Sequence, residues 1–185
     1  MSSGPAAVRR DQEGAAGLAR SLVRDVPDFP VPGVMFKDIT PVLRDPVAFP
    51  AVVDALHAAM PDEVDVVAGI EARGFIIGAP LAVRARAGFV PIRKSGKLPA
   101  QTLHAGYDLE YGQAEIEVHA DAFAARDSVV VVDDLLATGG TAAAACDLVE
   151  RAGARVAAVL FLLELGFLHG RTRMPGRDVF ALVTL

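Results

Sequence analysis

VVVVDDLLATGGT, residues 129–141, runs four valines directly into two adjacent carboxylates and then into a Gly-Gly pair flanked by threonines. Four consecutive β-branched residues bounded by turn signals are typical of a strand buried on both faces, as in a parallel sheet. In such a sheet, ligands bind at the carboxyl ends of the strands, where loops lead into the following helices. We therefore expect the functional site directly after Val132.

Length and composition indicate one globular domain. The chain has 185 residues, of which 52% are hydrophobic and 22% are charged. This is enough for one sizeable core and too short for two comfortable domains. We expect residues 1–10 to be disordered and residues 11–185 to form the single domain. The apolar surplus is compatible with a subunit interface.

Charge and cysteine usage exclude several classes of protein. The formal net charge of -5 argues against a broad nucleic-acid surface, so any bound anion must be held locally. Cys146 is the single cysteine, which excludes an internal disulfide, and the histidines are too scattered to suggest a zinc site. The apolar run VAAVLFLL stops at Glu164, well short of a membrane span. We expect a soluble cytoplasmic protein without a membrane or nucleic-acid partner.

Periodicity predicts an α/β fold with a mostly parallel sheet, because strands, loops and helices alternate along the chain. Two segments break this alternation and are expected to be loops: the proline-rich segment 26–46, and the glycine-rich and polar segment 95–112, which we expect to be mobile. Thr141 is the expected N-cap of the helix that follows the Gly-Gly pair. Helices are expected at 11–26, 46–60, 75–88 and 141–153, and strands at 64–69, 89–94, 115–121, 129–132, 156–163 and 179–185.

The residue types at 133–141 predict a grip for a pentose phosphate. Glycines and hydroxyls before a helix can turn backbone N–H groups toward an anion at the positive helix end. Asp133 and Asp134 would repel a phosphate unless a neutral polar group, such as a sugar diol, lay between them. The alternative is a capped helix beside two solvated acids. Neither a P-loop nor a G-x-G-x-x-G motif is present, so NTPases and Rossmann dinucleotide enzymes are unsupported.

The same stretch resembles the phosphoribosyl diphosphate motif of the type I phosphoribosyltransferases, and in detail that of the members acting on adenine. Further blocks with this resemblance are FPVPGVMFKDITPVL (29–43), GIEARGF (69–75), RKSGKLPAQT continuing to YDLEYG (93–112) and ELGFLHGR (164–171). The resemblance implies a mostly parallel central sheet flanked by helices, with a small hood and a mobile lid loop. It covers nearly all the chain beyond about residue 15.

The resemblance also assigns roles around the sugar and the leaving group. It places the ribose on Asp133 and Asp134, in agreement with the chemical argument above, and the diphosphate on Arg73 and the backbone of Glu71 and Ala72. On residue type alone, Lys94 and Lys97 would be interpreted as solvated surface charges. The 5-phosphate loop maps to Ala137, Thr138, Gly139, Gly140 and Thr141, and the additional diphosphate contacts to Arg93, Lys94 and Lys97.

For the base, the resemblance implies stacking of adenine on Phe36, with backbone groups near Met35 and Lys37 reading its edge. On residue type alone, Phe36 would be interpreted as a core residue. Enzymes for 6-oxopurines typically carry a basic aspartate where this chain has Ala137. The resemblance instead assigns proton transfer to Glu110, beside Tyr111 in the lid loop.

The implied reaction transfers the 5-phosphoribosyl group from phosphoribosyl diphosphate to N9 of adenine, giving AMP and diphosphate in purine salvage. The catalytic residues would be Glu110, Arg73 and Lys97, and the expected cofactor is Mg²⁺, held mainly by substrate and water rather than by protein ligands. A homodimer is expected. Two alternatives remain: a phosphoribosyltransferase for xanthine, and a regulatory protein that senses phosphoribosyl diphosphate without catalysis.

Overall fold

The computed structural model describes residues 5–109 and 112–185, and residues 1–4 and 110–111 lie outside this description. No helix in the described part is both long and apolar enough to cross a membrane. The elements are, in chain order, α1 (Pro5–Leu22), β1 (Arg24–Pro27), β2 (Met35–Asp38), α2 (Thr40–Arg44), α3 (Ala48–His57), β3 (Val66–Ile70), α4 (Arg73–Ala85), β4 (Gly88–Lys94), β5 (Thr102–Leu109), β6 (Gly112–His119), β7 (Ser128–Leu136), α5 (Gly140–Arg151), β8 (Arg155–Glu164), η1 (Gly166–Leu168), η2 (Gly170–Arg173) and β9 (Val179–Thr184).

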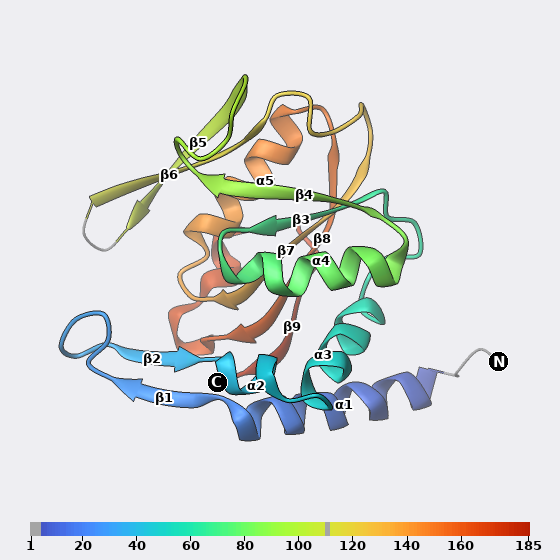
Figure 1. The fold of residues 1–185 in the computed structure, drawn as a ribbon, viewed down its shortest axis with the longest axis vertical. Helices are drawn as coiled ribbons and strands as arrows, with labels where there is room; N and C mark the ends of the chain where they lie inside the picture. Colours follow the sequence, from blue (N-terminus) through green and yellow to red (C-terminus); the bar gives the residue numbers. More distant parts are fainter. Residues whose placement is uncertain (1–4, 110–111) are drawn as a thin grey trace.

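The central sheet is mostly parallel, as the sequence predicted. Within the described residues it has seven strands in the order β5-β6-β4-β3-β7-β8-β9. The pairs from β4 through β3, β7 and β8 to β9 are parallel, whereas β6 pairs antiparallel with both β4 and β5. Helix α5 covers one face of this sheet, and α1, α3 and α4 cover the other (Figure 1).

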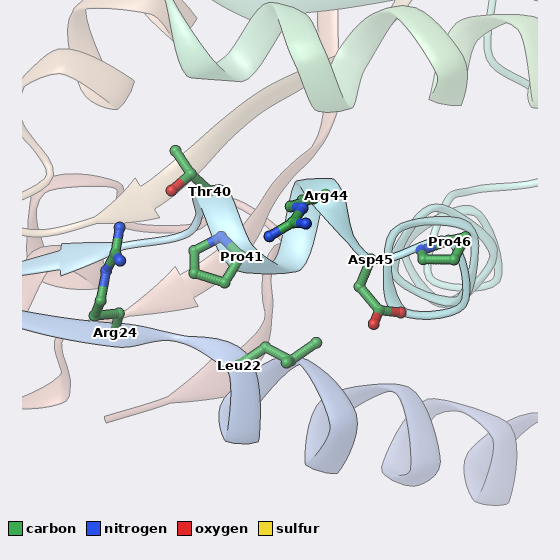
Figure 2. Close-up of a pocket in the computed structure, with 7 residues that line it drawn as sticks. All are labelled: Leu22, Arg24, Thr40, Pro41, Arg44, Asp45 and Pro46. Atoms are coloured by element: carbon green, nitrogen blue, oxygen red, sulfur yellow. The ribbon is translucent and has the colours of Figure 1, made fainter.

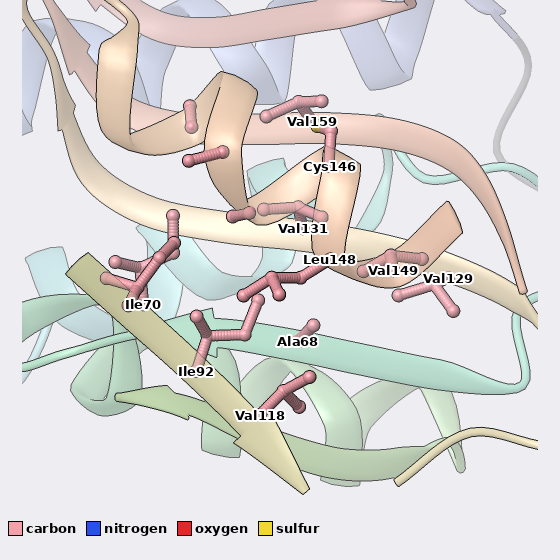
Figure 3. Packing of buried hydrophobic residues seen from close by; sticks show 14 of the residues in the cluster. Ala68, Ile70, Ile92, Val118, Val129, Val131, Cys146, Leu148, Val149 and Val159 are labelled. Atoms are coloured by element: carbon pink, nitrogen blue, oxygen red, sulfur yellow. The ribbon is translucent and has the colours of Figure 1, made fainter. Parts of the chain in front are cut away.

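Strand β7 is buried on both faces, which confirms the interpretation of the valine run. Val129 and Val131 pack into the core under α5, whereas Val130 and Val132 pack into the core under α1, α3 and α4. All four side chains are 0% exposed. Figure 3 shows Val129 and Val131 close to Leu148 of α5. An uninterrupted apolar run is therefore required here, because alternate residues serve two cores.

The chain reverses its direction of winding between β3 and β7. From β3 it passes through α4 to β4 on one side, and from β7 it passes through α5 to β8 on the other. The loops after these two adjacent strands therefore diverge and leave a crevice between them, which is where open α/β sheets bind ligands. The loop joining β1 and β2 lies on the side to which the arrowheads of β3, β4 and β7 point (Figure 1).

The proline-rich segment 26–46 is not an irregular loop throughout, contrary to the prediction. β1 and β2 form an antiparallel hairpin in which Val26 lies opposite Phe36, and α2 follows directly. Pro27 ends β1, and Pro41 occupies the first turn of α2, where the missing N–H is tolerated. The prolines therefore mark the ends of short elements.

The segment 95–112 was also predicted as a loop, but residues 102–109 form β5 and Gly112 begins β6. β5 pairs with β6 along its length, and β6, which includes most of the strand expected at 115–121, lies between β5 and β4 in the sheet. Cross-strand pairing stabilises this arm, and pairing partners are not visible in local composition. Glu110 and Tyr111 lie outside the described residues.

The first helix begins earlier than predicted. Residues 5–10, which we expected to be disordered, form the first turns of α1. Proline is well suited to the first helical position, and the alanine, arginine, glutamine and glutamate residues that follow are good helix formers. The helix ends at Leu22 rather than near residue 26, because β1 begins at Arg24.

The core under α5 makes a prediction about stability. Replacing Leu148, which is 0% exposed, by alanine should lower the free energy of unfolding by about 3 kcal/mol, since it removes apolar contacts and leaves a cavity. Urea unfolding followed by circular dichroism measures this change. Val47→Ala is the control, because Val47 is 67% exposed and should change stability by less than about 0.5 kcal/mol. Similar losses for both variants would contradict this packing.

Candidate active site

Two adjacent carboxylates lie at the carboxyl end of β7. Asp134 is 4% exposed, and its Oδ2 lies 2.8 Å from Nε of Arg73, the first residue of α4. Asp133 Oδ1 accepts a hydrogen bond of 2.8 Å from the backbone N–H of Asp134. The contact to Arg73 is an ion pair without hydrogen-bond geometry, so Asp134 Oδ2 has no directed hydrogen-bond partner among the described residues. In this structure the oxygen is therefore compensated only by the charge of Arg73.

The environment of the acid pair favours neutral carboxyls when no ligand is bound. Burial raises the pKa of Asp133, and the charge of Asp134 raises it further, to well above the ordinary value. Burial also raises the pKa of Asp134, and the neighbouring Arg73 only partly offsets this effect. Shifted pKa values of this kind are common at functional sites, because a bound ligand can supply the hydrogen bonds and charge that the acids lack in the free protein.

The loop after β7 leaves the amino end of α5 open. The N-cap is Gly139, with φ +83, and no side chain in the described part of the chain caps this end. The prediction that Thr141 is the N-cap was therefore wrong: the helix begins one residue earlier, at Gly140. A cavity of about 70 Å³ lies here, lined by Asp133 and by residues 135–142. Uncapped N–H groups facing a cavity at a helix amino end are suited to an anion.

Two glycines allow the loop after β8 to approach this cavity. A Cβ atom on Gly139 would collide with the carbonyl oxygen of Gly170, and a Cβ on Gly170 would collide with that of Ala137. Arg171 braces the approaching loop, with Nε at 2.9 Å and NH2 at 2.7 Å from the two carboxylate oxygens of Glu164. The ELGFLHGR block thus forms one wall of the anion loop.

Phe36 reaches the same crevice from the β1–β2 hairpin. The guanidinium carbon of Arg73 lies 5.0 Å from the centroid of the Phe36 ring. The ring also packs edge to face against Phe29, with centroids 5.1 Å apart. Arg73 therefore contacts both the acid pair and the aromatic ring, two features that are separated by about a hundred residues in the sequence.

The predicted diphosphate cations gather around Glu71, directly after β3. Glu71 Oε2 accepts hydrogen bonds from Arg93 Nε at 3.2 Å and from the backbone N–H of Lys94 at 3.0 Å. Burial opposes ionisation of Glu71, but these donors hold its pKa below the usual value. Arg93 NH1 donates to the carbonyl oxygen of Lys97 at 3.3 Å. Arg93, Lys94 and Lys97 therefore lie beside the end of β3.

Other predicted residues are placed less directly. Met35 is exposed, and Lys37 Nζ forms an ion pair of 2.7 Å with Asp25 across the hairpin, so a role for either rests on backbone groups. Ala72 is the residue before α4. The sequence analysis missed the Glu71 carboxylate and Glu117, a buried acid on β6 that accepts backbone hydrogen bonds from the Lys97 segment. No local pattern distinguishes these acids from surface glutamates.

A larger cavity of about 630 Å³ lies elsewhere, between the end of α1, the start of β1 and α2. Figure 2 shows Arg24, Thr40 and Arg44 around it. Its lining includes none of the residues of the acid pair, the anion loop or the Glu71 cluster. Size alone therefore does not identify the functional site.

Replacing Asp133 by asparagine should stabilise the ligand-free protein by about 1 kcal/mol, or about 3 °C in Tm, because it removes a buried carboxyl beside another acid. The raised pKa means that the native state holds this proton to higher pH than the unfolded chain does. Wild-type stability is therefore lost as pH rises above the unfolded pKa, and the advantage of asparagine should be full at alkaline pH and fade toward pH 4.

Thermal unfolding followed between pH 4 and pH 9 measures this difference. Asp62→Asn is the matched control, because that carboxyl is exposed. A Tm of the Asp133→Asn variant at or below that of the wild type at pH 8 would contradict the prediction that the acid pair destabilises the ligand-free protein.

Comparisons with known proteins agree with this geometry. Residues 52–176 match the family of the phosphoribosyl transferase domain. The chain is 61% identical to the adenine phosphoribosyltransferase of Streptomyces galbus over 85% of this chain and 87% of that protein, and 57% identical to that of Streptomyces coelicolor over 93% and 97%. The crystal structure of adenine phosphoribosyltransferase from Rhodothermus marinus superposes with a TM-score of 0.90 at 48% identity, covering 94% of this chain and 99% of that one. This chain belongs to the phosphoribosyltransferase family, among the relatives named adenine phosphoribosyltransferases.

Proposed function

We propose that this chain transfers the 5-phosphoribosyl group of phosphoribosyl diphosphate to N9 of adenine, releasing diphosphate and forming AMP. One observation carries the proposal: a buried acid pair is followed directly by an uncapped helix amino end, in the crevice between β3 and β7. Vicinal ribose hydroxyls can donate to the carboxylates while the 5-phosphate accepts from the N–H groups of the loop. Neither half of this site alone would select a pentose phosphate.

Asp133 and Asp134 have a second role during bond cleavage. When diphosphate leaves C1, positive charge develops on C1 and the ring oxygen, as in glycoside cleavage. Carboxylates that hold the ribose then stabilise the cationic sugar. Donation from the hydroxyls would also lower their pKa toward the ionised state, which offsets the burial described above.

The leaving diphosphate needs a cationic environment on the other side of C1. Arg73 begins α4 beside the acid pair, and Arg93, Lys94 and Lys97 lie around Glu71. These groups, with the backbone N–H groups near Glu71 and Ala72, would neutralise the charge that accumulates on the leaving oxygens. Because the chain as a whole has a net charge of -5, a local group of cations supports an anion-binding role at this place.

The residues present also fit a role for Mg²⁺. The described residues contain no group of three or more side chains that could hold a metal ion by themselves. Mg²⁺ keeps several waters and commonly binds through substrate phosphates and one or two carboxylates, and Asp134 Oδ2 is a buried oxygen without a directed partner. Held mainly by substrate oxygens and water beside the acid pair, Mg²⁺ would withdraw charge from the diphosphate. The protein itself would contribute by orienting the sugar through Asp133 and Asp134.

Adenine would stack on Phe36, with its edge read by backbone groups near Met35 and Lys37. The ring is held by Phe29 and lies beside Arg73, so the base would lie near the sugar. N9 attacks C1 on the face opposite the diphosphate, and Glu110, beside Tyr111, takes or guides the proton. Ala137 replaces the aspartate that serves 6-oxopurine enzymes, which favours adenine over hypoxanthine and guanine.

We further expect a cytoplasmic homodimer, as implied by the family. Ile76 and Val83 support a subunit interface, because these α4 side chains are 45% and 79% exposed. They would form part of an apolar surface suited to a second copy. Sedimentation at several protein concentrations tests this expectation.

A product assay tests the proposed function. Purified protein with Mg²⁺ and phosphoribosyl diphosphate should form nucleotide from adenine and little from hypoxanthine, guanine or xanthine, as followed by chromatography. Nucleotide formed from xanthine would keep the sugar phosphate site but reject adenine as the base. Binding of phosphoribosyl diphosphate without any product would instead favour a regulatory sensor.

The Phe36 assignment gives a separate prediction. Phe36→Ala should raise KM for adenine about tenfold, because stacking of a base on an aromatic ring contributes about 1 to 3 kcal/mol. KM for phosphoribosyl diphosphate should change far less. Steady-state kinetics with each substrate varied in turn measure both constants, and Val47→Ala, a change at a side chain that is 67% exposed and lies away from the site, is the control. An unchanged KM for adenine would reject the stacking role.

A further inference from the structure

Glu117 is a buried carboxylate on β6 for which the reaction described above has no role. It is 2% exposed. Its Oε1 accepts two backbone hydrogen bonds, from the N–H of Lys97 at 2.7 Å and from the N–H of Leu98 at 2.8 Å. One side chain on a strand therefore holds the turn that carries an exposed lysine.

The charge state of Glu117 agrees with this arrangement. Burial opposes its ionisation, but the N–H groups of Leu98 and Lys97 hold its pKa below the ordinary value. The other ionisable groups near it are Arg93, its cross-strand partner on β4, His104, whose Nε2 lies 3.9 Å from Oε2, and Glu115, whose charge repels that of Glu117. Hydrogen bonds to an ionised acceptor are about twice as strong as neutral ones.

The Lys97 peptide is held from both ends. Glu117 accepts from its N–H, and Arg93 NH1 donates to its carbonyl oxygen. Arg93 is in turn held by Glu71 at the end of β3. A continuous chain of contacts thus runs from Glu71 through Arg93 and the Lys97 backbone to Glu117, and it links the crevice to the base of the β5–β6 arm.

We propose that Glu117 is a positioning residue, which fixes the backbone of Lys97 so that the Lys97 ammonium faces the leaving diphosphate. This inference rests on the proposed function. A lysine side chain is flexible, so its charge acts at a defined place only if its backbone is held. Two hydrogen bonds from one carboxylate to consecutive N–H groups restrict the position of the turn more than a single contact would.

Two substitutions distinguish the effect of the length of the Glu117 side chain from the effect of its charge. Glu117→Gln keeps an oxygen acceptor at the same distance along the side chain but removes the charge, whereas Glu117→Asp keeps the charge but shortens the side chain by one methylene. If Glu117 acts by holding the turn, Glu117→Asp should raise KM for phosphoribosyl diphosphate about tenfold, and Glu117→Gln should raise it by less than about threefold. KM for adenine should stay near the wild-type value in both.

A double-mutant cycle tests whether the effect passes through Lys97. In a Lys97→Ala background, Glu117→Asp should change KM for phosphoribosyl diphosphate by less than about twofold, because the charge that it positions is already absent. Glu115→Gln is the matched control, since Glu115 lies on the same strand but is exposed and pairs with His104 and Ser95, whereas the N–H groups of Lys97 and Leu98 donate to Glu117. It should leave both KM values unchanged.

Several outcomes would overturn the assignment. A purely structural role would lower kcat through loss of active protein while leaving both KM values unchanged, and this pattern would reject positioning. If Glu117→Asp raised KM for phosphoribosyl diphosphate tenfold both with and without Lys97, Glu117 would act elsewhere. If Glu117→Gln raised this KM more than Glu117→Asp, the charge of Glu117 and not its length would be responsible. Failure of the wild type to form AMP would reject the proposed function, whereas normal kinetics in all variants would reject only the role of Glu117.

Discussion

The site depends on the placement of charge at the end of a strand that is buried on both faces. Because Val129–Val132 fill two cores, β7 cannot shift its register without exposing apolar side chains, and Asp133 and Asp134 are therefore held at the edge of the sheet. Asp134 is almost inaccessible, and Arg73 compensates its charge without forming a directed hydrogen bond. The sheet thus holds two adjacent acids in an environment that raises the pKa of both, with burial as the main cause.

Arg73 connects this acid pair to the rest of the crevice. It begins α4, so the packing of α4 against β7 sets its position, and Gly74 makes that packing possible because a Cβ there would collide with the carbonyl oxygen of Val132. From this position its guanidinium also meets the ring of Phe36. The acid pair and the Phe36 ring are therefore coupled through one cation rather than through direct contact.

Much of this arrangement could be predicted from local sequence. The valine run, the acid pair and the Gly-Gly loop lie within thirteen residues, and their chemistry follows from residue type and order. The two hairpins were not predicted because the prolines of one segment and the glycines and polar residues of the other were interpreted as loop signals, and pairing between neighbouring strands overrides such composition. The contact of Arg73 with Phe36 and the burial of Glu71 and Glu117 depend on the folded topology.

The positions of these buried acids also explain how a cationic patch can exist before any diphosphate binds. Arg93, Lys94 and Lys97 would repel one another if they were left to a common solvent-exposed turn. Glu71 and Glu117 instead accept hydrogen bonds from Arg93 and from the backbones of Lys94 and Lys97, so that the turn is ordered while the lysine ammonium groups remain exposed. In the reaction proposed above, a leaving diphosphate would then meet cations whose backbone is already fixed, and less ordering entropy would be lost at the step where charge develops.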